Sequence, residues 1–491
     1  MNPIRVLYEN LPAKADRPAL HDGDLTLSHS ELIARVEAAA ADLFARGLSG
    51  RRIGLSASNS WRHVVAYLAI LRAGAVWVPL NPLNGPGLNG ELIARAGLDL
   101  LIAETEAEDA LDLAAWLGAA RSGPLPDILD DPDADFAIKF TGGTTGKPKG
   151  VVQSQASAAG ALRSMRAFYG FTERDVNLAV APLTHGSSHY VLPVLAAGGA
   201  HVLLARPERG AILDELKRRV TTVFMPPTLI YLLMGEARFG PRDFPALRRL
   251  TYSAAPMPPA RVAETLARFG PVLDSLYGQT EAPMAITAQT PADMADPALA
   301  GSVGRPFAGT PVRILTADDR VAEVGEGEVL VGGDLARTTY LDDPQATAAA
   351  RHDGWLRTGD IGRLGADGRL TLIGRAREMI ISGGYNIYPA EAETALAGHP
   401  AVREVCAFGV DDATWGERLE AAVALSAPVD DAELTAFVRD RLGPVRTPKA
   451  LHRLDALPRN PVGKVVRAEV KRLIYPAPRP DEGTLRTRET T

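Results

Sequence analysis

Alternation of strand-like and helix-like segments is the strongest constraint that the sequence places on the fold. The run LSHSELIARVEAAAADLFARG has apolar residues at helical intervals; it begins with Ser28 three residues before Glu31 and ends at Gly47. RRIGLSAS then predicts a strand, WRHVVAYLAILRAG a helix and AVWVPLNP another strand, and the pattern returns in AHVLLA, ILDELKRRVTTVFMPP and LRRLTY. Because alternating strands and helices pack as a parallel sheet covered by helices, we expect layered α/β subdomains.

The pattern changes in the last third of the chain. GEGEVLVGG and GRLTLIG place short β-branched runs between glycines and predict an antiparallel β segment. Further on, EVCAFGV and EAAVALS predict strands and DAELTAFVRDRLG a helix. We therefore expect an α/β protein with a large N-terminal domain, residues 1–376, and a small α+β C-terminal domain, residues 377–475. Residues 476–491 are proline-rich and then polar, which is typical of a disordered tail.

Composition and charge narrow the possible partners. The 491 residues have a net charge of -6 with mixed signs, which disfavours nucleic acid as the main partner. The single cysteine, Cys406, cannot form an intramolecular disulfide, and this is typical of a reducing compartment. The N-terminal run MNPIRVLYENLPAKAD lacks an apolar signal core, and no run approaches the roughly 20 apolar residues of a membrane span. We expect a cytoplasmic protein.

The stretch FTGGTTGKPKG, residues 140–150, has the chemistry of a phosphate-binding loop. Its glycines expose backbone N–H groups, its threonines add hydroxyl donors, and Lys147 and Lys149 add positive charge. It is not a Walker A loop, because Lys147 is followed by Pro148 rather than by serine or threonine. Taken alone, such a loop is equally well explained as a surface turn, so other segments must decide.

Six ordered motifs decide in favour of phosphate binding. They are TGGTTGKPKG (141–150), APLTHGSS (181–188), YGQTEAP (277–283), GWLRTGD (354–360), GRAREMIISGGYNIYPAEAE (374–393) and PRNPVGK (458–464). With them the chain resembles the adenylate-forming superfamily of acyl-CoA synthetases, adenylation domains and firefly-type luciferases. The resemblance implies that a carboxylate attacks the α-phosphate of Mg-ATP, giving an acyl-adenylate and pyrophosphate, and that a thiol, usually of coenzyme A, then displaces AMP. Such chemistry depends on positioning and charge neutralisation.

The resemblance also assigns the nucleotide-binding residues. Glu281 is the implied magnesium ligand, Thr280 contacts the α-phosphate, and Asp360 accepts hydrogen bonds from the ribose hydroxyls, with Arg375 beside the ribose. In isolation, a Thr-Glu pair could cap a helix and an Asp after Gly could be a turn residue. Gly142 stands where serine is more common, which removes one hydroxyl donor. The implied ATP- and AMP-binding set is Thr141, Gly142, Gly143, Thr144, Thr145, Gly146, Lys149, Ser253, Ala254, Ala255, Tyr277, Gly278, Gln279, Asp360 and Arg375.

Residues of the small domain are implied in both half-reactions. Lys464 bridges the carboxylate and the α-phosphate and is the main catalytic candidate, together with Glu281, Thr280 and His185. Arg377 occupies the hinge position, where Asp or Lys is usual, and the small domain rotates about it between steps. Gly383, Gly384 and Tyr385 form the thiolation loop, with Tyr385 in place of a common Glu.

The sequence constrains the identity of the substrate acid less than it constrains the reaction. No acidic residue lies between Pro182 and Gly199, and this disfavours an amino-acid substrate, whose ammonium needs a partner. The expected pocket is small or apolar and suits an aryl, hydroxycinnamoyl or medium-chain aliphatic acid. Its residues are His185, Gly186, Ser187, Ser188, Met225, Ala254, Ala255 and Met284.

Three alternatives are weaker. His185 and His189 have a metal-binding spacing, but no third ligand is near in the sequence. LDSLYG contains the Asp-Ser-Leu triplet of a carrier-protein attachment site at Ser275, but it runs directly into YGQTE, so we favour free coenzyme A as acceptor over loading of a carrier protein. A serine hydrolase would need a G-x-S-x-G elbow, which the sequence lacks. The expected partners are ATP, magnesium, coenzyme A and a small acid, in a monomer or homodimer.

Overall fold

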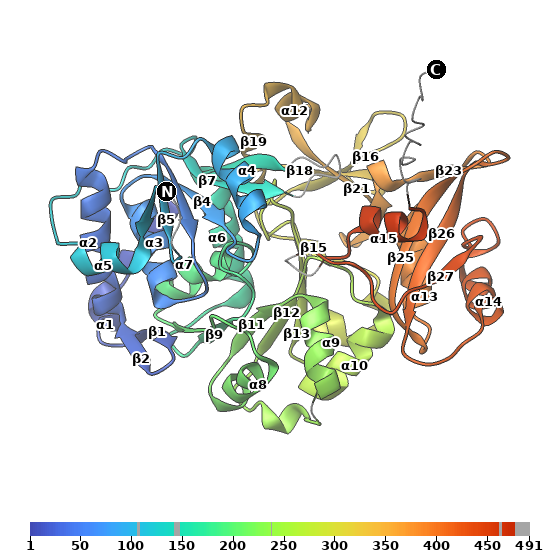
Figure 1. The fold of residues 1–491 in the computed structure, drawn as a ribbon, viewed down its shortest axis with the longest axis horizontal. Coiled ribbons are helices and arrows are strands. Elements are labelled where there is room, and N and C mark those ends of the chain that lie inside the picture. The colour runs from blue at the N-terminus through green and yellow to red at the C-terminus, as the bar shows by residue number, and fades with distance from the viewer. Residues whose placement is uncertain (106–108, 142–147, 237, 461–463, 477–491) are drawn as a thin grey trace, which may run out of the picture. The chain divides into compact units, whose positions relative to one another are not determined.

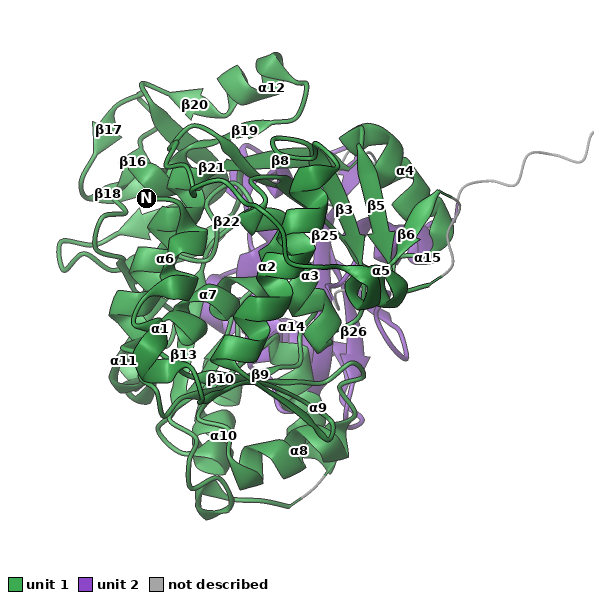
Figure 2. Cartoon of the chain, turned by 90° about the vertical axis from the view of Figure 1, so that its left-hand side faces the viewer, with its two compact units in different colours: residues 1–376 green, residues 377–491 purple. Residues whose placement is uncertain are grey.

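The computed structural model describes residues 1–105, 109–141, 148–236, 238–460 and 464–476. Its chain divides into two compact units, residues 1–376 and 377–491, which are coloured separately in Figure 2. The predicted phosphate-loop residues Gly142 to Gly146, and all but the first residue of the predicted tail, lie outside the described residues.

Two mainly parallel sheets form the body of the first unit (Figure 1). In the larger sheet β1, β10, β9, β11, β12 and β13 run parallel; at its edges β2 pairs antiparallel with β1, β14 with β13, and β15 with β14. In the second sheet β7, β4, β3, β5 and β6 are parallel; β8 pairs antiparallel with β7, and β19 pairs antiparallel with β8. In spatial order, the larger sheet is β15 (Arg305–Pro306), β14 (Thr287–Gln289), β13 (Leu273–Tyr277), β12 (Arg249–Tyr252), β11 (Thr222–Met225), β9 (Val176–Ala179), β10 (Ala200–Leu203), β1 (Pro18–Asp22) and β2 (Leu25–Ser28); the second is β19 (Thr338–Tyr340), β8 (Lys149–Ser154), β7 (Asp135–Thr141), β4 (Val76–Leu80), β3 (Arg52–Ser56), β5 (Leu100–Ala103) and β6 (Ala110–Asp112).

Helices between these sheets bury a shared apolar core. One cluster of buried side chains combines β1, β9 and β10 of one sheet, β3, β4 and β7 of the other, and helices α2, α3, α6 and α7. Figure 2 shows these four helices between the two sheets. Helix α2 begins at the predicted capping box, in which Glu31 N donates to Ser28 Oγ and Ser28 N donates to Glu31 Oε2. The helices of the first unit are α1 (Leu11–Lys14), α2 (His29–Ala45), α3 (Trp61–Arg72), α4 (Pro86–Ala96), α5 (Leu113–Ala119), α6 (Gln155–Tyr169), α7 (Ser188–Ala196), α8 (Arg209–Arg218), α9 (Pro227–Glu236), α10 (Pro259–Phe269), α11 (Pro291–Ala295) and α12 (Pro344–Ala349), with 3-10 turns η1 (Pro3–Tyr8), η2 (Pro241–Asp243), η3 (Pro297–Leu299) and η4 (Asp334–Ala336). The 3-10 turn η5 (Ala376–Glu378) includes the last residue of the first unit and the first two of the second.

The antiparallel segment predicted near residues 325–374 is a third sheet of the first unit. Each strand pairs antiparallel with its neighbours, and β21 and β22 bring Asp360 opposite Arg375. In order the strands are β17 (Val321–Ala322), β16 (Val312–Leu315), β18 (Gly325–Val331), β21 (Trp355–Leu364) and β20 (Arg351–His352), with β22 (Leu370–Arg375) also beside β21.

The second unit is a small α+β structure with its own core. Strands β25 and β26 form its long antiparallel pair, and α13, α14 and α15 pack around its apolar side chains. The α/β fold class predicted from the alternation, with an antiparallel segment and a small C-terminal part, is confirmed. The elements of this unit are β23 (Ile380–Ser382), β24 (Tyr385–Ile387), α13 (Pro389–Ala397), β25 (Val402–Asp412), β26 (Gly416–Leu425), α14 (Asp431–Leu442), β27 (Leu451–Arg453) and α15 (Arg467–Ile474).

The position of Ser275 bears on the carrier-protein alternative. Ser275 lies inside β13, is 5% exposed and hydrogen-bonds through Oγ to Gln289 Oε1, so its hydroxyl is not presented for attachment of a pantetheine arm.

Cys406 is a buried free thiol in β25, and burial raises the pKa of this thiol to about 12. Among the described residues, no helix has the length and apolar character needed to span a membrane.

Candidate active site

Four predicted site segments of the first unit follow the carboxyl ends of parallel strands. Residues 253–256 follow β12, residues 278–284 follow β13, residues 180–187 follow β9, and the phosphate loop follows β7 at Thr141. In open α/β sheets, ligands bind at this end of the strands. The topology therefore gathers segments that are far apart in the sequence at the carboxyl ends of two sheets.

Asp360 is the centre of a buried cluster of hydrogen-bond donors. Its residue is 5% exposed, and its carboxylate accepts from Tyr277 OH and Gln279 Nε2, both at 2.5 Å to Oδ2. Arg375 Nε lies 2.7 Å from Oδ1. Burial, followed by the adjacent Asp360 charge, raises the pKa of Tyr277 well above its usual value, so the phenol stays protonated as a donor. The structure thus brings together the predicted residues Tyr277, Gln279, Asp360 and Arg375.

A second cluster connects the predicted magnesium ligand to the predicted phosphate-binding lysine. Tyr340 OH, at the end of β19, donates to Glu281 Oε1 at 2.9 Å, and Lys149 Nζ lies 5.1 Å from the centre of the Tyr340 ring. Thr338 Oγ1 also donates to the backbone oxygen of Glu281. Thr141 pairs with Lys149 across the β7–β8 hairpin and donates through Oγ1 to its carbonyl. The Tyr340 side chain therefore contacts both Glu281 and Lys149, and Lys149 pairs with Thr141. These contacts connect Thr141 and Glu281, which are 140 positions apart in the sequence.

Carboxylate and phosphate chemistry fit this second cluster. A magnesium ion prefers hard oxygen ligands and is commonly held by one or two carboxylates together with phosphate oxygens and water. Glu281 would supply one such carboxylate, and the Tyr340 hydroxyl donates a hydrogen bond to it. The Lys149 ammonium would supply positive charge for phosphate oxygens. The residues present fit Mg-ATP.

An aromatic side chain packs against the segment that is predicted to line the acid pocket. A Cβ added to Gly186 would lie 2.7 Å from Cε1 of Phe224 and 3.6 Å from Sδ of Met284, so the bare Gly186 backbone is needed for this approach. The Phe224 ring stacks on Tyr190, with ring centres 5.8 Å apart. Tyr190 is fixed in turn by a hydrogen bond between its hydroxyl and that of Tyr169, 2.7 Å apart.

Two non-glycine residues of this region adopt left-handed backbone angles. Ala254 has φ 74° and Met284 has φ 60°. Such angles cost L-residues energy and are enriched at functional sites, where surrounding structure holds them. Gly278 leaves no room for a side chain, because an added Cβ would lie 2.6 Å from the backbone nitrogen of Met284. The segments 253–256 and 278–284 are therefore held in tightly defined conformations.

The turn that carries His185 is fixed from within. His185 N donates to Pro182 O, its Nδ1 lies 2.9 Å from Thr184 Oγ1, and its carbonyl accepts a 2.8 Å hydrogen bond from Ser188 Oγ. His185 is exposed, whereas Ser187 and Ser188 are 3% and 4% exposed. Of this turn, His185 is thus the side chain presented to solvent.

The remaining predicted site residues of the first unit lie as follows. Met225 is fully buried in an apolar core with Ile230 and Leu233, while its strand neighbour Phe224 faces Gly186, because adjacent side chains of a strand point to opposite faces. Ser253 is buried, and Ala254 and Ala255 are exposed. Thr280 is half-buried, and its carbonyl accepts from Gln153 Nε2 at 2.8 Å.

The predicted residues of the second unit lie on exposed turns. Gly383 and Gly384 form the two-residue turn between β23 and β24, and both have positive φ, as such a hairpin requires. Tyr385 is 61% exposed. Lys464 is exposed, and its backbone exchanges hydrogen bonds with Asn460. Arg377, the predicted hinge residue, is exposed in η5 at the first position of this unit.

Sequence reasoning missed Tyr340, Phe224, Gln153 and Lys139. The first three carry no local signal, because their contacts come from pairing of distant strands. Lys139 did carry a signal. It is a single charged residue in the apolar strand FAIKF, and the structure buries it to 8% exposure.

The fold and the two clusters favour an ATP-dependent enzyme. The comparison with known families is consistent with this class. The chain matches the AMP-binding enzyme family over residues 7–341 and the AMP-binding enzyme C-terminal domain over residues 391–464. It belongs to the family of AMP-binding enzymes. The predicted superfamily, the predicted enzyme class of AMP-forming acid–thiol ligases and the predicted use of ATP, magnesium and coenzyme A are thereby confirmed.

Similar proteins span nearly the whole chain. It is 31% identical to a medium/long-chain-fatty-acid–CoA ligase, FadD8, of Mycobacterium tuberculosis, covering 95% of this chain and 89% of the relative. It is 33% identical to a feruloyl-CoA synthase of Amycolatopsis sp., covering 92% and 95%. Among solved structures, the amide bond synthetase McbA from Marinactinospora thermotolerans matches with a TM-score of 0.85 at 28% identity, covering 96% of this chain and 100% of that one.

Proposed function

We propose that this AMP-forming carboxylate–CoA ligase activates an acid with a flat, apolar body, of the aryl or hydroxycinnamoyl type. The observation that carries the substrate class is the close packing of the Phe224 ring against Gly186, with Met284 beside it, at the segment predicted to line the acid pocket. The ring is backed by Tyr190 and Tyr169, so its plane is fixed. A rigid aromatic surface favours a planar partner over a flexible chain, because offset ring pairs gain roughly 0.5–1.5 kcal/mol beyond area burial.

The chain's own groups support the two half-reactions as follows. In the first, a carboxylate oxygen of the acid bonds to the α-phosphorus of ATP and pyrophosphate leaves; Thr141, Lys149, Thr280 and Lys464 are proposed to bind the charged oxygens. Asp360 is proposed to hold the ribose, and Glu281 the magnesium ion that neutralises phosphate charge. In the second, the coenzyme A sulfur bonds to the acyl carbon and AMP leaves. Gly383 and Gly384 are proposed to line the approach of the thiol, after rotation about Arg377.

The direct test is acid-dependent release of pyrophosphate and AMP from Mg-ATP, with and without coenzyme A, across benzoates, hydroxycinnamates and aliphatic acids of increasing length. We expect planar acids to give the highest kcat/KM, with AMP release requiring coenzyme A. Highest activity with aliphatic acids would contradict the substrate class. Turnover with amines or a carrier protein in place of coenzyme A would contradict the proposal that coenzyme A is the acceptor. Amines are included because a similar structure is an amide bond synthetase.

We also propose a cytoplasmic location, which the lone Cys406 favours.

Enlarging Gly186 should affect acid binding selectively. In Gly186→Ala the added Cβ would lie 2.7 Å from the Phe224 ring, so the ring must shift and the pocket must change shape. We expect KM for the acid to rise roughly 10-fold, the size of effect of one methylene in an apolar pocket, with KM for ATP nearly unchanged. Gly210→Ala is the matched control, since its added Cβ meets nothing within 4 Å. Equal changes in KM for acid and ATP would place Gly186 outside the acid pocket.

Removing the Tyr340 hydroxyl should weaken magnesium binding. Tyr340→Phe deletes the 2.9 Å hydrogen bond to Glu281 Oε1 while keeping the ring near Lys149. Loss of a group that orients a metal ligand typically costs about 10- to 100-fold in metal affinity. We expect the magnesium concentration for half-maximal activity to rise by a factor in that range. Tyr8→Phe, which also removes a tyrosine hydroxyl bound to a glutamate, Glu37, should leave the magnesium dependence unchanged.

A further inference from the structure

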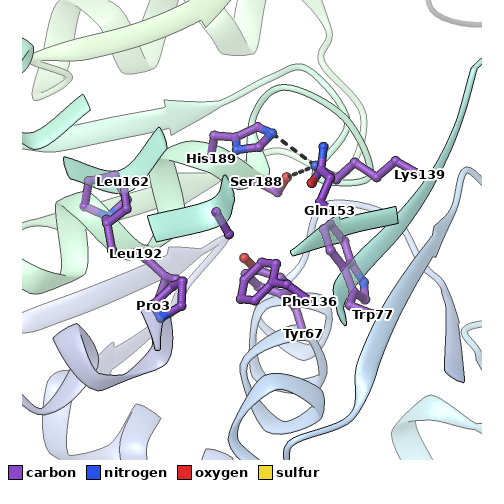
Figure 3. A pocket seen from close by; sticks show the side chains of 12 residues that line it. Pro3, Tyr67, Trp77, Phe136, Lys139, Gln153, Leu162, Ser188, His189 and Leu192 are labelled. Carbon is purple, nitrogen blue, oxygen red and sulfur yellow. Dashed lines mark hydrogen bonds between the residues drawn. The ribbon is translucent and has the colours of Figure 1, made fainter. Parts of the chain in front are cut away.

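A buried amine lies beside the active-site segments and has no part in the reaction described above. Lys139 of β7 lines a small cavity of about 30 Å³, space for about two water molecules. Its Nζ lies 3.1 Å from His189 Nε2 and 3.3 Å from Ser188 Oγ, both of helix α7 (Figure 3). Trp77, Tyr67 and Phe136 form the apolar side of the same cavity.

The hydrogen-bond directions around Lys139 follow from its neighbours. The Ser188 hydroxyl donates its hydrogen to His185 O, so its oxygen is left to accept from Lys139. His189 Nε2 accepts a second hydrogen when its proton is on Nδ1. The third hydrogen of the ammonium form faces the Trp77 ring, whose centre lies 5.1 Å from Nζ. The protonated amine is therefore satisfied on all three sides, and deprotonation removes one of these interactions.

The charge of this amine is not balanced within the cavity. The titratable residues that line it are Tyr67 of α3, Lys139 of β7 and His189 of α7, and none of its lining residues is acidic. Burial lowers the pKa of Lys139 from 10.5 to about 7. Burial, followed by the Lys139 charge, lowers the pKa of His189 well below its usual value. The two bases thus carry at most one proton between them near neutral pH.

The pair lies where three active-site segments meet. Lys139 precedes Thr141 of the phosphate loop by two residues, and Ser188, which binds the Lys139 amine, also holds the carbonyl of His185. Gln153, another residue lining the cavity, donates to the carbonyl of Thr280. One side chain, Ser188, therefore connects the amine to the His185 turn.

We propose that Lys139 and His189 are positioning residues, which share one proton and hold the His185 turn against the β7 strand in the arrangement that acid activation requires. The proposal rests on the proposed function, because the His185 turn is assigned there to the acid pocket. Its consequence is that acid activation is controlled by the ionisation of a buried amine that contacts neither ATP nor the acid. The protonated pair is the active form.

The kinetic test is the pH profile of kcat/KM for the acid in wild type, Lys139→Met and His189→Gln, from about pH 5.5 to 9. Met matches the volume of Lys and cannot titrate, and Gln keeps an oxygen acceptor for Lys139. In wild type we expect kcat/KM for the acid to fall as pH rises through about 7. Lys139→Met should have an activity roughly 10-fold lower and lack this inflection, and His189→Gln should retain the inflection. An inflection of equal size in Lys139→Met would show that Lys139 has only a structural role and would overturn the proposal.

A second measurement does not depend on finding the substrate. Because the folded-state pKa of Lys139 is lowered, the folded protein binds fewer protons than the unfolded chain between about pH 7 and 10.5. Below pH 7 the destabilising contribution of the buried Lys139 charge is therefore fully present. This contribution is lost, and the free energy of unfolding rises, as pH increases from about 7 to 10.5. We expect the difference in urea midpoint between Lys139→Met and wild type to be largest at pH 6 and to shrink by pH 9.5. A constant difference would overturn the proton-sharing pair even if ligase activity is found, whereas a shrinking difference without acid-dependent turnover would overturn only the proposed function.

Discussion

Replacement of Lys464 with alanine is expected to lower the rate of acyl-adenylate formation by on the order of 10³-fold. The reason is electrostatic, since the proposed role of this ammonium is to stabilise negative charge that develops as the carboxylate attacks the α-phosphate, and loss of one such group typically costs 10²–10³ in kcat. The measurement is acid-dependent exchange of labelled pyrophosphate into ATP. Lys464 is exposed, so the substitution should leave the fold intact.

The second half-reaction separates this role from a general loss of function. Thiolysis of a supplied acyl-adenylate by coenzyme A does not include attack on phosphorus, and we expect Lys464→Ala to retain it within a fewfold. Lys449→Ala is the matched control, because Lys449 is another exposed lysine of the second unit, with its Nζ bound to Pro444 O. Equal losses in both half-reactions would rule out a role specific to adenylation.

Asp360→Asn should produce the second large effect, an increase in KM for ATP of about 100-fold. The carboxylate is proposed to accept hydrogen bonds from the ribose hydroxyls, and charge-assisted bonds of this kind contribute roughly 1.5–3 kcal/mol each. Asparagine keeps the size but turns one acceptor into a donor, which then faces Tyr277, Gln279 or Arg375, all of which are donors already. ATP and AMP affinity can be measured by calorimetry.

The same substitution also has a predicted cost in stability. At least one buried donor around Asp360 loses its acceptor, and an unsatisfied buried polar group costs about 1–3 kcal/mol. Asp318→Asn offers a control, because Asp318 is also bound to an arginine, Arg320, but lies in an exposed turn. We expect it to change neither nucleotide affinity nor stability measurably. Unchanged nucleotide affinity in Asp360→Asn would remove Asp360 from the ribose site.

Local patterns in the sequence were sufficient to predict most elements of the fold. The capping box at Ser28, the helical spacing through Ala45 and the short apolar runs between glycines each depend on residues within one element. The six motifs were sufficient to predict the family and the enzyme class, because each is a contiguous run of residues that can be recognised without the fold. Capping boxes, helical spacing and contiguous motifs depend only on residues that are close together in the sequence.

Only the tertiary structure decided which distant side chains meet. Tyr277 and Asp360 are separated by 83 residues, and Lys139 and His189 by 50, yet each pair shares a hydrogen bond. The sequence analysis placed Met225 in the acid pocket, but which of Phe224 and Met225 faces Gly186 depends on the orientation of β11 in its sheet. Burial likewise changes the chemistry of Lys139 through neighbours from several elements. The sequence by itself therefore determined the elements and the reaction class, whereas sheet pairing and burial determined the contacts and proton affinities of the site, because those depend on groups brought together only in the folded chain.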